Sequence, residues 1–443
     1  MSNVPGRCAA ALLAMLVPLA GQAETSPYYL GLSQAFGHDS NIFRAPDRTE
    51  VALPGGGVQV IVPASSGLIS TTLLLAGLDQ TIGRQRVYGT LNAGYSSYSA
   101  QSQLDGPRYA LTAGVDWDTV ERVSGKAEFN SGRRLGAFGD RNLPTGRGDN
   151  DERYNRVMLL ARLGEGQRSR NWIETSLVYD QVSNDIQFLE PVPYDITIDP
   201  ITGAPVVRLS DGYRRDEPSA AFTLGVRHRL SGAVVLGAGL RTESRREEFE
   251  RKLIDPVESV VTSSLKSRRN DFDLFATFSA NDMHNLSLRL SYGNRDYEDP
   301  AVADLTGWSG NLNWDWRPTD KIGGNLRLLY DTEDRELGGA SAADGSGNSK
   351  TLAMELRLRY AITGKVSADL AANWYQRDYG SRGGYTDHDS LLSLTLNWAA
   401  LRNASLGCTV ALDRRSSSYE GPAAGRSSYD ATLFSCFGQI TLQ

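Results

Sequence analysis

Hydrophobic and polar side chains alternate strictly along most of this chain. In residues 351–360, Leu, Met or Tyr stands at every even position, whereas Thr351, Glu355, Arg357 and Arg359 stand at odd positions. Residues 286–292 repeat the pattern, with Leu or Tyr at even positions and Ser or Arg at odd ones. Because neighbouring side chains of a β-strand point to opposite faces, the pattern predicts a sheet with one apolar and one polar face.

The alternation and the turn residues between its segments predict eighteen strands, joined by connections that are short and long in turn. An even strand number, with short turns at one end and long loops at the other, is typical of bacterial outer-membrane barrels, whose termini are both periplasmic. We therefore expect an all-β fold: a transmembrane, antiparallel, up-and-down β-barrel with both termini in the periplasm. The expected strands are 28–36, 67–79, 85–98, 107–118, 123–134, 153–164, 171–183, 216–230, 233–248, 266–280, 284–296, 304–317, 320–334, 349–362, 365–379, 387–400, 403–418 and 428–442.

Three tryptophans agree with this topology. Trp117, Trp316 and Trp398 each end a strand that is expected to run toward the periplasm. Indole rings are favoured at the level of the lipid headgroups, so these residues predict one belt of an aromatic girdle. The alternative is that they fill a core, as large aromatic residues do in soluble sheets.

The net charge and the N-terminal segment indicate the partners and the cellular compartment of the chain. The chain has 443 residues and a net charge of −6, which argues against nucleic acid as a partner. Its one long apolar run, residues 8–20, follows Arg7 and is followed by small residues up to Ala23. These are the parts of a secretory signal peptide cleaved after Ala23. We expect a signal peptide at 1–23 and an outer-membrane β-barrel at 24–443.

Removal of the signal peptide would leave two cysteines, Cys408 and Cys436, in an oxidising compartment. Both stand at the apolar parity of the last two strands. If the final hairpin turns about Pro422, the two cysteines face each other directly, close enough for a bond. We expect a cross-strand disulfide; the alternative is two reduced, inert thiols.

The polar parity carries many charges and several tyrosines, which would line the lumen. One interpretation is structural, because charges in a lumen pair across strands and stiffen the wall. The other is a hydrophilic passage in which Tyr rings stack on sugars and Arg side chains bind acidic or hydroxylated glycans. The candidate lumen residues are Arg227, Arg241, Arg289, Arg327, Arg357, Arg359, Asp271, Asp273, Asp331, Glu355, Tyr88 and Tyr375.

No residue pattern predicts catalysis, a metal site or a cofactor. The four histidines, at positions 38, 228, 284 and 388, have no Ser, Cys or carboxylate partner at a spacing typical of a triad or metal site. The segment 38–44 places Asp, Ser and Asn in sequence. Such residues form Asx turns by bonding their own backbone, and this interpretation is favoured over calcium binding, for which the ligand spacing is incomplete.

Four short motifs resemble the EpsL-type proteins, which are β-barrel porin 2-like proteins linked to exopolysaccharide biosynthesis and export in Gram-negative bacteria. The motifs are YLGL at 29–32, DSNIFR at 39–44, GRQRVY at 83–88 and CFGQITLQ at 436–443. The resemblance implies an outer-membrane protein of a polysaccharide pathway and supplies no catalytic or binding residues. The chain departs from the usual barrel-assembly signal, which ends in an aromatic residue, because Gln443 is last.

Together these features predict an outer-membrane, porin-like barrel that takes part in the export or biosynthesis of extracellular polysaccharide. Its expected partners are outer-membrane lipid, the polysaccharide, and periplasmic or outer-membrane components of the secretion machinery. A second hypothesis is a non-conducting scaffold or binding barrel of that machinery. A third is a barrel enzyme acting on glycan or lipid, which the histidine pattern does not favour. The loops 37–66 and 184–215 are long enough to fold inward and constrict the lumen.

Overall fold

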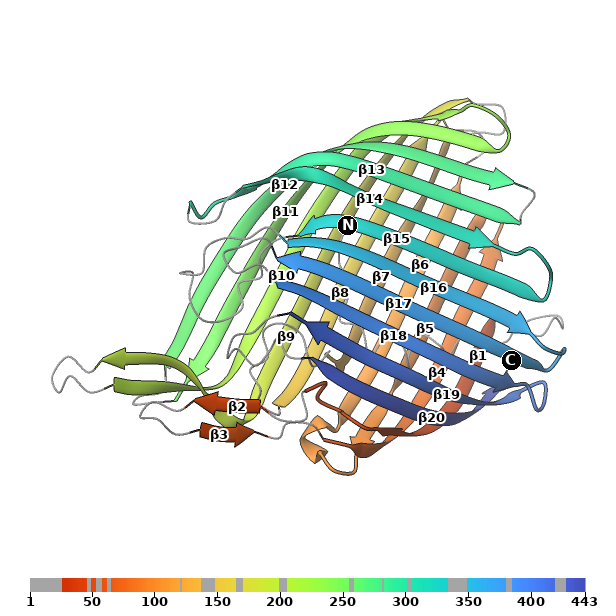
Figure 1. The fold of residues 1–443 in the computed structure, drawn as a ribbon. Helices are drawn as coiled ribbons and strands as arrows, with labels where there is room; N and C mark the ends of the chain where they lie inside the picture. The colour runs from red at the N-terminus through yellow and green to blue at the C-terminus, as the bar shows by residue number, and fades with distance from the viewer. Residues whose placement is uncertain are drawn as a thin grey trace.

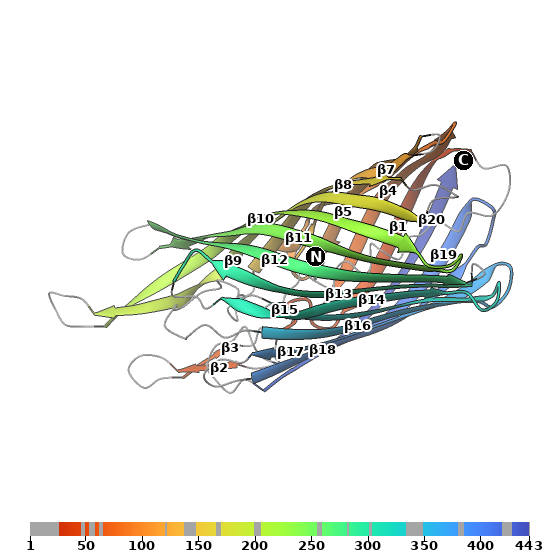
Figure 2. The ribbon, with the colours of Figure 1, turned by 90° about the horizontal axis from the view of Figure 1, so that it is seen from above.

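The computed structural model shows one closed antiparallel sheet of eighteen strands, coiled into a barrel (Figures 1 and 2). Consecutive strands of the sheet pair, and β1 (Tyr28–Asp39) pairs with both β20 (Tyr429–Leu442) and β4 (Gly67–Ile82), which closes it. The predicted all-β, up-and-down barrel of eighteen strands is confirmed. The structure describes residues 26–45, 49–52, 58–61, 65–119, 122–136, 148–164, 170–198, 205–254, 259–280, 283–300, 304–333, 349–379, 385–418 and 428–442, so the expected signal peptide lies outside the described residues.

Outside β8–β12, every strand boundary lies within three residues of the predicted one. Strand formation at these positions follows the alternation, because only a two-residue period keeps Leu on one face and charges on the other. The remaining strands are β5 Gln85–Tyr98, β6 Gly106–Asp118, β7 Val123–Leu135, β8 Gly148–Leu163, β9 Asn171–Ile198, β10 Pro205–Arg229, β11 Val234–Leu253, β12 Ser259–Ala280, β13 His284–Tyr297, β14 Leu305–Trp316, β15 Ile322–Glu333, β16 Ser349–Ala361, β17 Val366–Tyr379, β18 Tyr385–Trp398 and β19 Ala404–Ser417.

Strands β9 to β12 are longer than predicted. Most of the expected loop 184–215 continues β9 and β10, which project beyond their neighbours in Figure 1. Polar residues such as Asp185 and Arg214, which pair in register there, interrupt the apolar parity, so the sequence did not reveal the extension. A separate hairpin, β2 (Thr49–Ala52) with β3 (Val58–Ile61), also forms within the expected loop 37–66.

The two faces of the sheet differ as the alternation predicts. In β19, Leu406, Val410 and Leu412 are 46–51% exposed, whereas Thr409 and Asp413 are 7% and 5% exposed. The exposed apolar side chains cover the outside of the barrel and the polar ones face its interior. A barrel of this kind satisfies all backbone hydrogen bonds internally while presenting hydrocarbon outward. Among the described residues, no helix is long and apolar enough to cross a membrane.

The beginning of β1 and the end of β20 lie side by side, since Leu30 pairs with Leu442. We call this end of the barrel the terminal end and the opposite one, where Asp39 lies, the loop end. Trp316 and Trp398 pair with the first residues of β13 and β17, so both stand at the terminal end, as the girdle interpretation requires. That the terminal end faces the periplasm stays a prediction.

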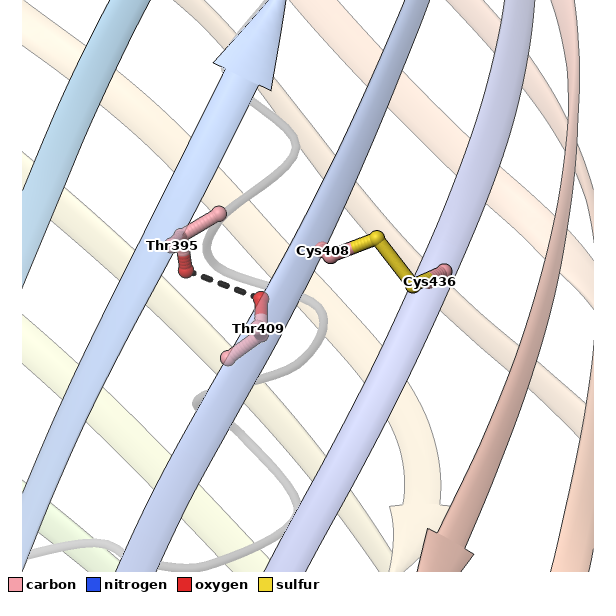
Figure 3. The surroundings of a disulfide bond; sticks show 4 residues. All are labelled: Thr395, Cys408, Thr409 and Cys436. Atoms are coloured by element: carbon pink, nitrogen blue, oxygen red, sulfur yellow. Dashed lines mark hydrogen bonds between the residues drawn. A yellow bond between two sulfur atoms is a disulfide. The ribbon is translucent and has the colours of Figure 1, made fainter.

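The structure contains the predicted disulfide between Cys408 and Cys436 (Figure 3). The two residues are direct cross-strand partners in β19 and β20, and their sulfur atoms are 2.10 Å apart. The bond lies at the outward parity, beside the exposed Val410. On the inward parity next to it, the hydroxyls of Thr395 and Thr409 are hydrogen-bonded at 2.8 Å. The disulfide therefore fastens the last hairpin next to the seam where β20 meets β1.

Removing this disulfide should destabilise the barrel without preventing its closure. The bond joins residues that are 28 positions apart, so Cys408→Ala/Cys436→Ala should lower the free energy of unfolding by about 2–4 kcal/mol. Urea unfolding in detergent micelles, followed by gel mobility, measures the change. Two free thiols in exported wild-type protein, detected by mass spectrometry without reductant, would contradict the bond itself.

Candidate functional site: the charged interior

The twelve predicted lumen residues all stand at interior positions of the strands. Arg241 follows the exposed Leu240, and Asp273 lies between the exposed Phe272 and Leu274. Because successive side chains alternate, these charged residues point inward. The same parity places the other ten inside, on β5, β10–β13 and β15–β17. Contact of these residues with a solute stays a prediction.

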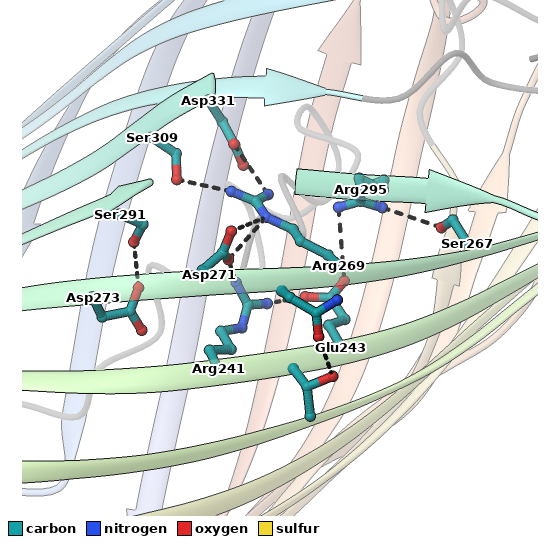
Figure 4. Close-up of polar contacts among 12 residues, drawn as sticks. Arg241, Glu243, Ser267, Arg269, Asp271, Asp273, Ser291, Arg295, Ser309 and Asp331 are labelled. Carbon is teal, nitrogen blue, oxygen red and sulfur yellow. Dashed lines mark hydrogen bonds and ion pairs between the residues drawn. The ribbon is translucent and has the colours of Figure 1, made fainter. Parts of the chain in front are cut away.

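The interior charges of β11, β12 and β15 form one network (Figure 4). Asp271 accepts hydrogen bonds from Arg269 Nε at 3.0 Å and from Arg241 Nη1 at 3.4 Å. Arg269 Nη1 also donates to Asp331 at 3.2 Å, and Arg241 forms an ion pair with Glu243. Strands β12 and β15 are not neighbours in the sheet, so the network ties the wall together over two intervening strands.

Asp273 has the most enclosed carboxylate of the twelve predicted residues and is 0% exposed. It accepts two hydrogen bonds from Arg289 Nη2, at 2.7 and 2.9 Å, and one from Ser291 Oγ at 2.5 Å. A buried charge is costly unless it is paired and hydrogen-bonded, and this one is both. Asp273 therefore fixes the position of the Arg289 guanidinium, and Ser291 in turn holds the Asp273 carboxylate in place.

The two predicted tyrosines use their hydroxyls within the wall. Tyr88 donates to Glu128 at 2.7 Å, and Tyr375 donates to Glu355 at 2.8 Å. Tyr375 is 4% exposed and packs with Leu329. The ring of Tyr375 is thus covered, and this arrangement favours the structural interpretation of the tyrosines over stacking on sugars.

The charges of β15–β17 contact one another more loosely than those of β11–β13. Arg327 lies 3.8 Å from Glu355, and Arg359 lies 3.9 Å from Asp369. Arg357, between them on β16, is exposed and has uncharged cross-strand neighbours on both sides. These arginines therefore keep more freedom to meet a solute.

A cavity of about 710 Å³ lies against the interior wall from β8 to β15. It brings together Arg227, Arg241, Arg289 and Arg327 of the predicted set, whereas Asp271, Asp273, Asp331 and Glu355 do not line it. Eight arginines line this cavity among the described residues. Its carboxylates are Glu174, Asp180 and Glu243.

An apolar cluster occupies the interior at the loop end, and we call it the mouth cluster. Ile42 and Phe43, just after β1, belong to the same buried cluster as Tyr213 and Phe249 of β10 and β11. The ring centroids of Tyr213 and Phe249 are 4.9 Å apart. Since β10 and β11 stand about halfway round the sheet from β1, the cluster crosses the barrel. Its residues are Ile42, Phe43, Leu104, Leu135, Ile186, Phe188, Tyr213 and Phe249.

Arg44 anchors the segment that carries Ile42 and Phe43. Its Nε donates to Asp413 at 2.7 Å and its Nη1 to Asp39 at 2.9 Å, and all three residues are buried. The backbone N–H of Asn41 also donates to Asp39, at 2.8 Å, which is the Asx turn expected for this segment. The carboxylate of Asp39, which a calcium ion would need as a ligand, is thus already paired with the guanidinium of Arg44. Residues 41–45, the described start of the expected loop 37–66 beyond β1, thus fold inward.

The histidines take no part in the interior site. His284 stacks on Trp314 and His388 on Trp374, with ring centroids 6.0 and 6.3 Å apart. Both histidines stand at the outward parity of the strands. No group of three or more His, Cys, Asp or Glu residues in the described part of the chain is arranged to hold a metal ion.

Sequence reasoning missed two parts of the interior. Phe275 and Trp172 line the cavity. The Cζ of Arg227 lies 3.7 Å from the ring centroid of Phe275, and the Cζ of Arg229 lies 5.6 Å from that of Trp172. Phe275 shares the parity of Asp273, so the alternation could have placed it inside. Nothing in the sequence connects Arg44 with Asp413, because 369 positions separate them.

A family model described as "Putative beta-barrel porin 2" matches residues 284–435, about a third of the chain. This match supports a β-barrel porin family and leaves the EpsL-type resemblance a prediction. No curated protein matches the sequence.

Solved structures similar to the chain include several transporters and porins. The copper transporter OprC is 11% identical, with a TM-score of 0.47 over 95% of this chain and 81% of that one. The ferric yersiniabactin uptake receptor FyuA from Yersinia pestis is 10% identical, with the same TM-score and coverage. OccK2 (OpdF) of Pseudomonas aeruginosa is 13% identical, with a TM-score of 0.41 over 95% of this chain and 100% of that one. At TM-scores below 0.5, these likenesses say nothing about what this barrel carries.

Replacing Arg44 with alanine should release the segment 39–45. The substitution removes the cation that the buried carboxylates of Asp39 and Asp413 contact, which should lower the free energy of opening this segment by about 3 kcal/mol. The backbone amides of residues 39–45 should therefore exchange hydrogen about a hundredfold faster. Mass spectrometry of the folded barrel in detergent measures the exchange. The matched control is Arg414→Ala. Arg414 is next to Asp413 on β19, and its loss breaks an exposed cross-strand pair with Asp430 of β20, so it should change nothing measurable. Equal exchange in wild type and Arg44→Ala would refute the anchor.

Proposed function

We propose that this chain is a porin-like barrel of the Gram-negative outer membrane, through which extracellular polysaccharide passes during its export. The observation that carries the proposal is a closed wall of eighteen strands, apolar outside and charged inside, with a large polar cavity in its interior. A barrel of this size is wide enough for an aqueous passage. The porin family match and the EpsL-type resemblance support the porin and the polysaccharide parts respectively.

The interior chemistry suits a hydroxylated chain. Arg227, Arg289 and Arg327 line the cavity and keep N–H groups that can donate to sugar oxygens. A solute that exchanges hydrogen bonds from one guanidinium to the next loses little energy as it advances. The proposed partners follow: outer-membrane lipid on the outer face, polysaccharide inside, and components of the secretion machinery at the terminal end.

The mouth cluster favours a second candidate function. Ile42 and Phe43 pack across the loop end, and Arg44 anchors them there, so in the described part of the chain this segment narrows the exit at that end. A barrel that stayed so would serve as a non-conducting scaffold or binding protein of the secretion machinery. A passage instead requires this segment to move aside.

Planar-bilayer conductance of wild type and of Phe43→Ala/Arg44→Ala discriminates the two functions. For a passage, the double variant should open at least about tenfold more often than wild type, because it loses both the apolar packing and the anchor of the closed state. Arg414→Ala serves as the control and should behave as wild type. Silence of all three folded proteins under every voltage and salt condition would reject the passage and leave the scaffold.

Deletion of the gene tests the polysaccharide part of the proposal separately. Surface polysaccharide should fall strongly in the deletion strain and return on complementation with wild type. Complementation with Arg357→Ala/Arg359→Ala should restore less of it, since these exposed arginines face the proposed path. Unchanged surface polysaccharide in the deletion strain would sink this part.

A further inference from the structure

Most arginines of the cavity are more exposed than the carboxylates that they pair with, namely Arg156, Arg162, Arg245, Arg289 and Arg327. The side chain of Arg162 is 38% exposed and that of its partner Glu174 is 18% exposed. Arg289 is 23% exposed, whereas Asp273 behind it is fully covered. The order is reversed at Arg227 and Arg241, which are less exposed than Glu174 and Glu243 beside them. The surface that meets the cavity is therefore formed mainly by guanidinium groups, with Glu174, Asp180 and Glu243 between them.

Carboxylates are also fewer than arginines at this surface. Glu174 serves two of them, accepting from Arg162 Nε at 2.9 Å and from Arg227 Nη2 at 2.5 Å. Behind this surface, Asp271 is shared by the lining residue Arg241 and by Arg269, which does not line the cavity. Eight arginines against three carboxylates line the cavity, whereas Asp271, Asp273, Glu217 and Glu355 pair with four of these arginines without lining it. An anion entering the cavity would therefore be attracted rather than repelled.

The guanidinium groups are held in place before any solute arrives. Phe275 stacks under Arg227 at 3.7 Å and lies 5.8 Å from Arg289. Among the described residues, Arg289 bonds Asp273 through Nη2 alone, which leaves the N–H groups of its Nη1 for a solute. Preorganised guanidiniums bind carboxylates through paired N–H groups with little further loss of side-chain entropy.

We propose that this cavity binds acidic oligosaccharides, whose sugars carry carboxylates, in preference to neutral ones of equal length. The sugar part rests on the proposed function, whereas the preference for anions rests on the cavity itself. The carboxylate of the sugar would contact Arg227 and Arg289 on either side of Phe275, and its hydroxyls would contact the neighbouring polar wall.

The test is titration calorimetry of the folded barrel in detergent with hexagalacturonate and, for comparison, neutral maltohexaose. Wild type should bind hexagalacturonate at least about tenfold more tightly than maltohexaose, and added salt should weaken that binding. Arg227→Gln/Arg289→Gln should lose about tenfold in affinity for the acidic sugar. Arg414→Gln, on the outer face, should leave the affinity unchanged.

Glu174→Gln separates charge from damage to the fold. This substitution keeps the shape of the side chain but frees Arg162 and Arg227 from their shared carboxylate, so affinity for hexagalacturonate should rise, whereas a damaged wall would lower it. Equal affinity for the two sugars, binding of neither, or a fall with Glu174→Gln would overturn the proposal. If the barrel binds hexagalacturonate but shows no conductance, the proposed passage is rejected and the binding site stands. If it conducts but does not prefer the acidic sugar, the binding site is rejected and the passage stands.

Discussion

The closure of the sheet at β1 is the constraint on which the rest of the structure depends. Hydrocarbon offers no hydrogen-bond partner, so every backbone N–H and C=O within a bilayer must pair inside the protein. In this chain, Leu30 pairs with Leu442 on one side and with Ala76 on the other, and no strand of the barrel is left with an open edge. A shift of one residue in the register of a strand would turn its leucines inward and its charges outward, so the sheet can close in the bilayer only with this register.

Closure also forces the polar side chains into a confined interior, where charges must find partners. Asp273 with Arg289 and Asp271 with Arg241 and Arg269 satisfy that requirement across neighbouring strands. The same pairing leaves Arg241 and Arg289 lining the cavity, whereas Asp271 and Asp273 do not line it. The wall that stabilises the barrel is therefore also the surface that a solute would meet, and its structural and functional roles are compatible.

Much of this fold could be predicted, because a two-residue alternation fixes both strand and face. It located the strands, and the shared parity of Cys408 and Cys436 led to the disulfide. Prediction failed where the alternation ends. The extensions of β9–β12 carry polar residues on both faces, and the contact of Arg44 with Asp413 depends on an inward fold that no local pattern signals. The interior position of Tyr375 was predictable, but its packing against Leu329 was not.

The central claim is that the leucine-rich face touches lipid while the charged face does not. Variants with a single tryptophan at position 308, 398 or 172, in bilayers that contain brominated lipid, test it most directly. Trp308 and Trp398 are 57% and 50% exposed on the outer face, and Trp172 is 8% exposed on the inner one. Strong quenching of the first two and little quenching of Trp172 is the predicted result. Quenching of Trp172 as strong as that of Trp308 would contradict the account.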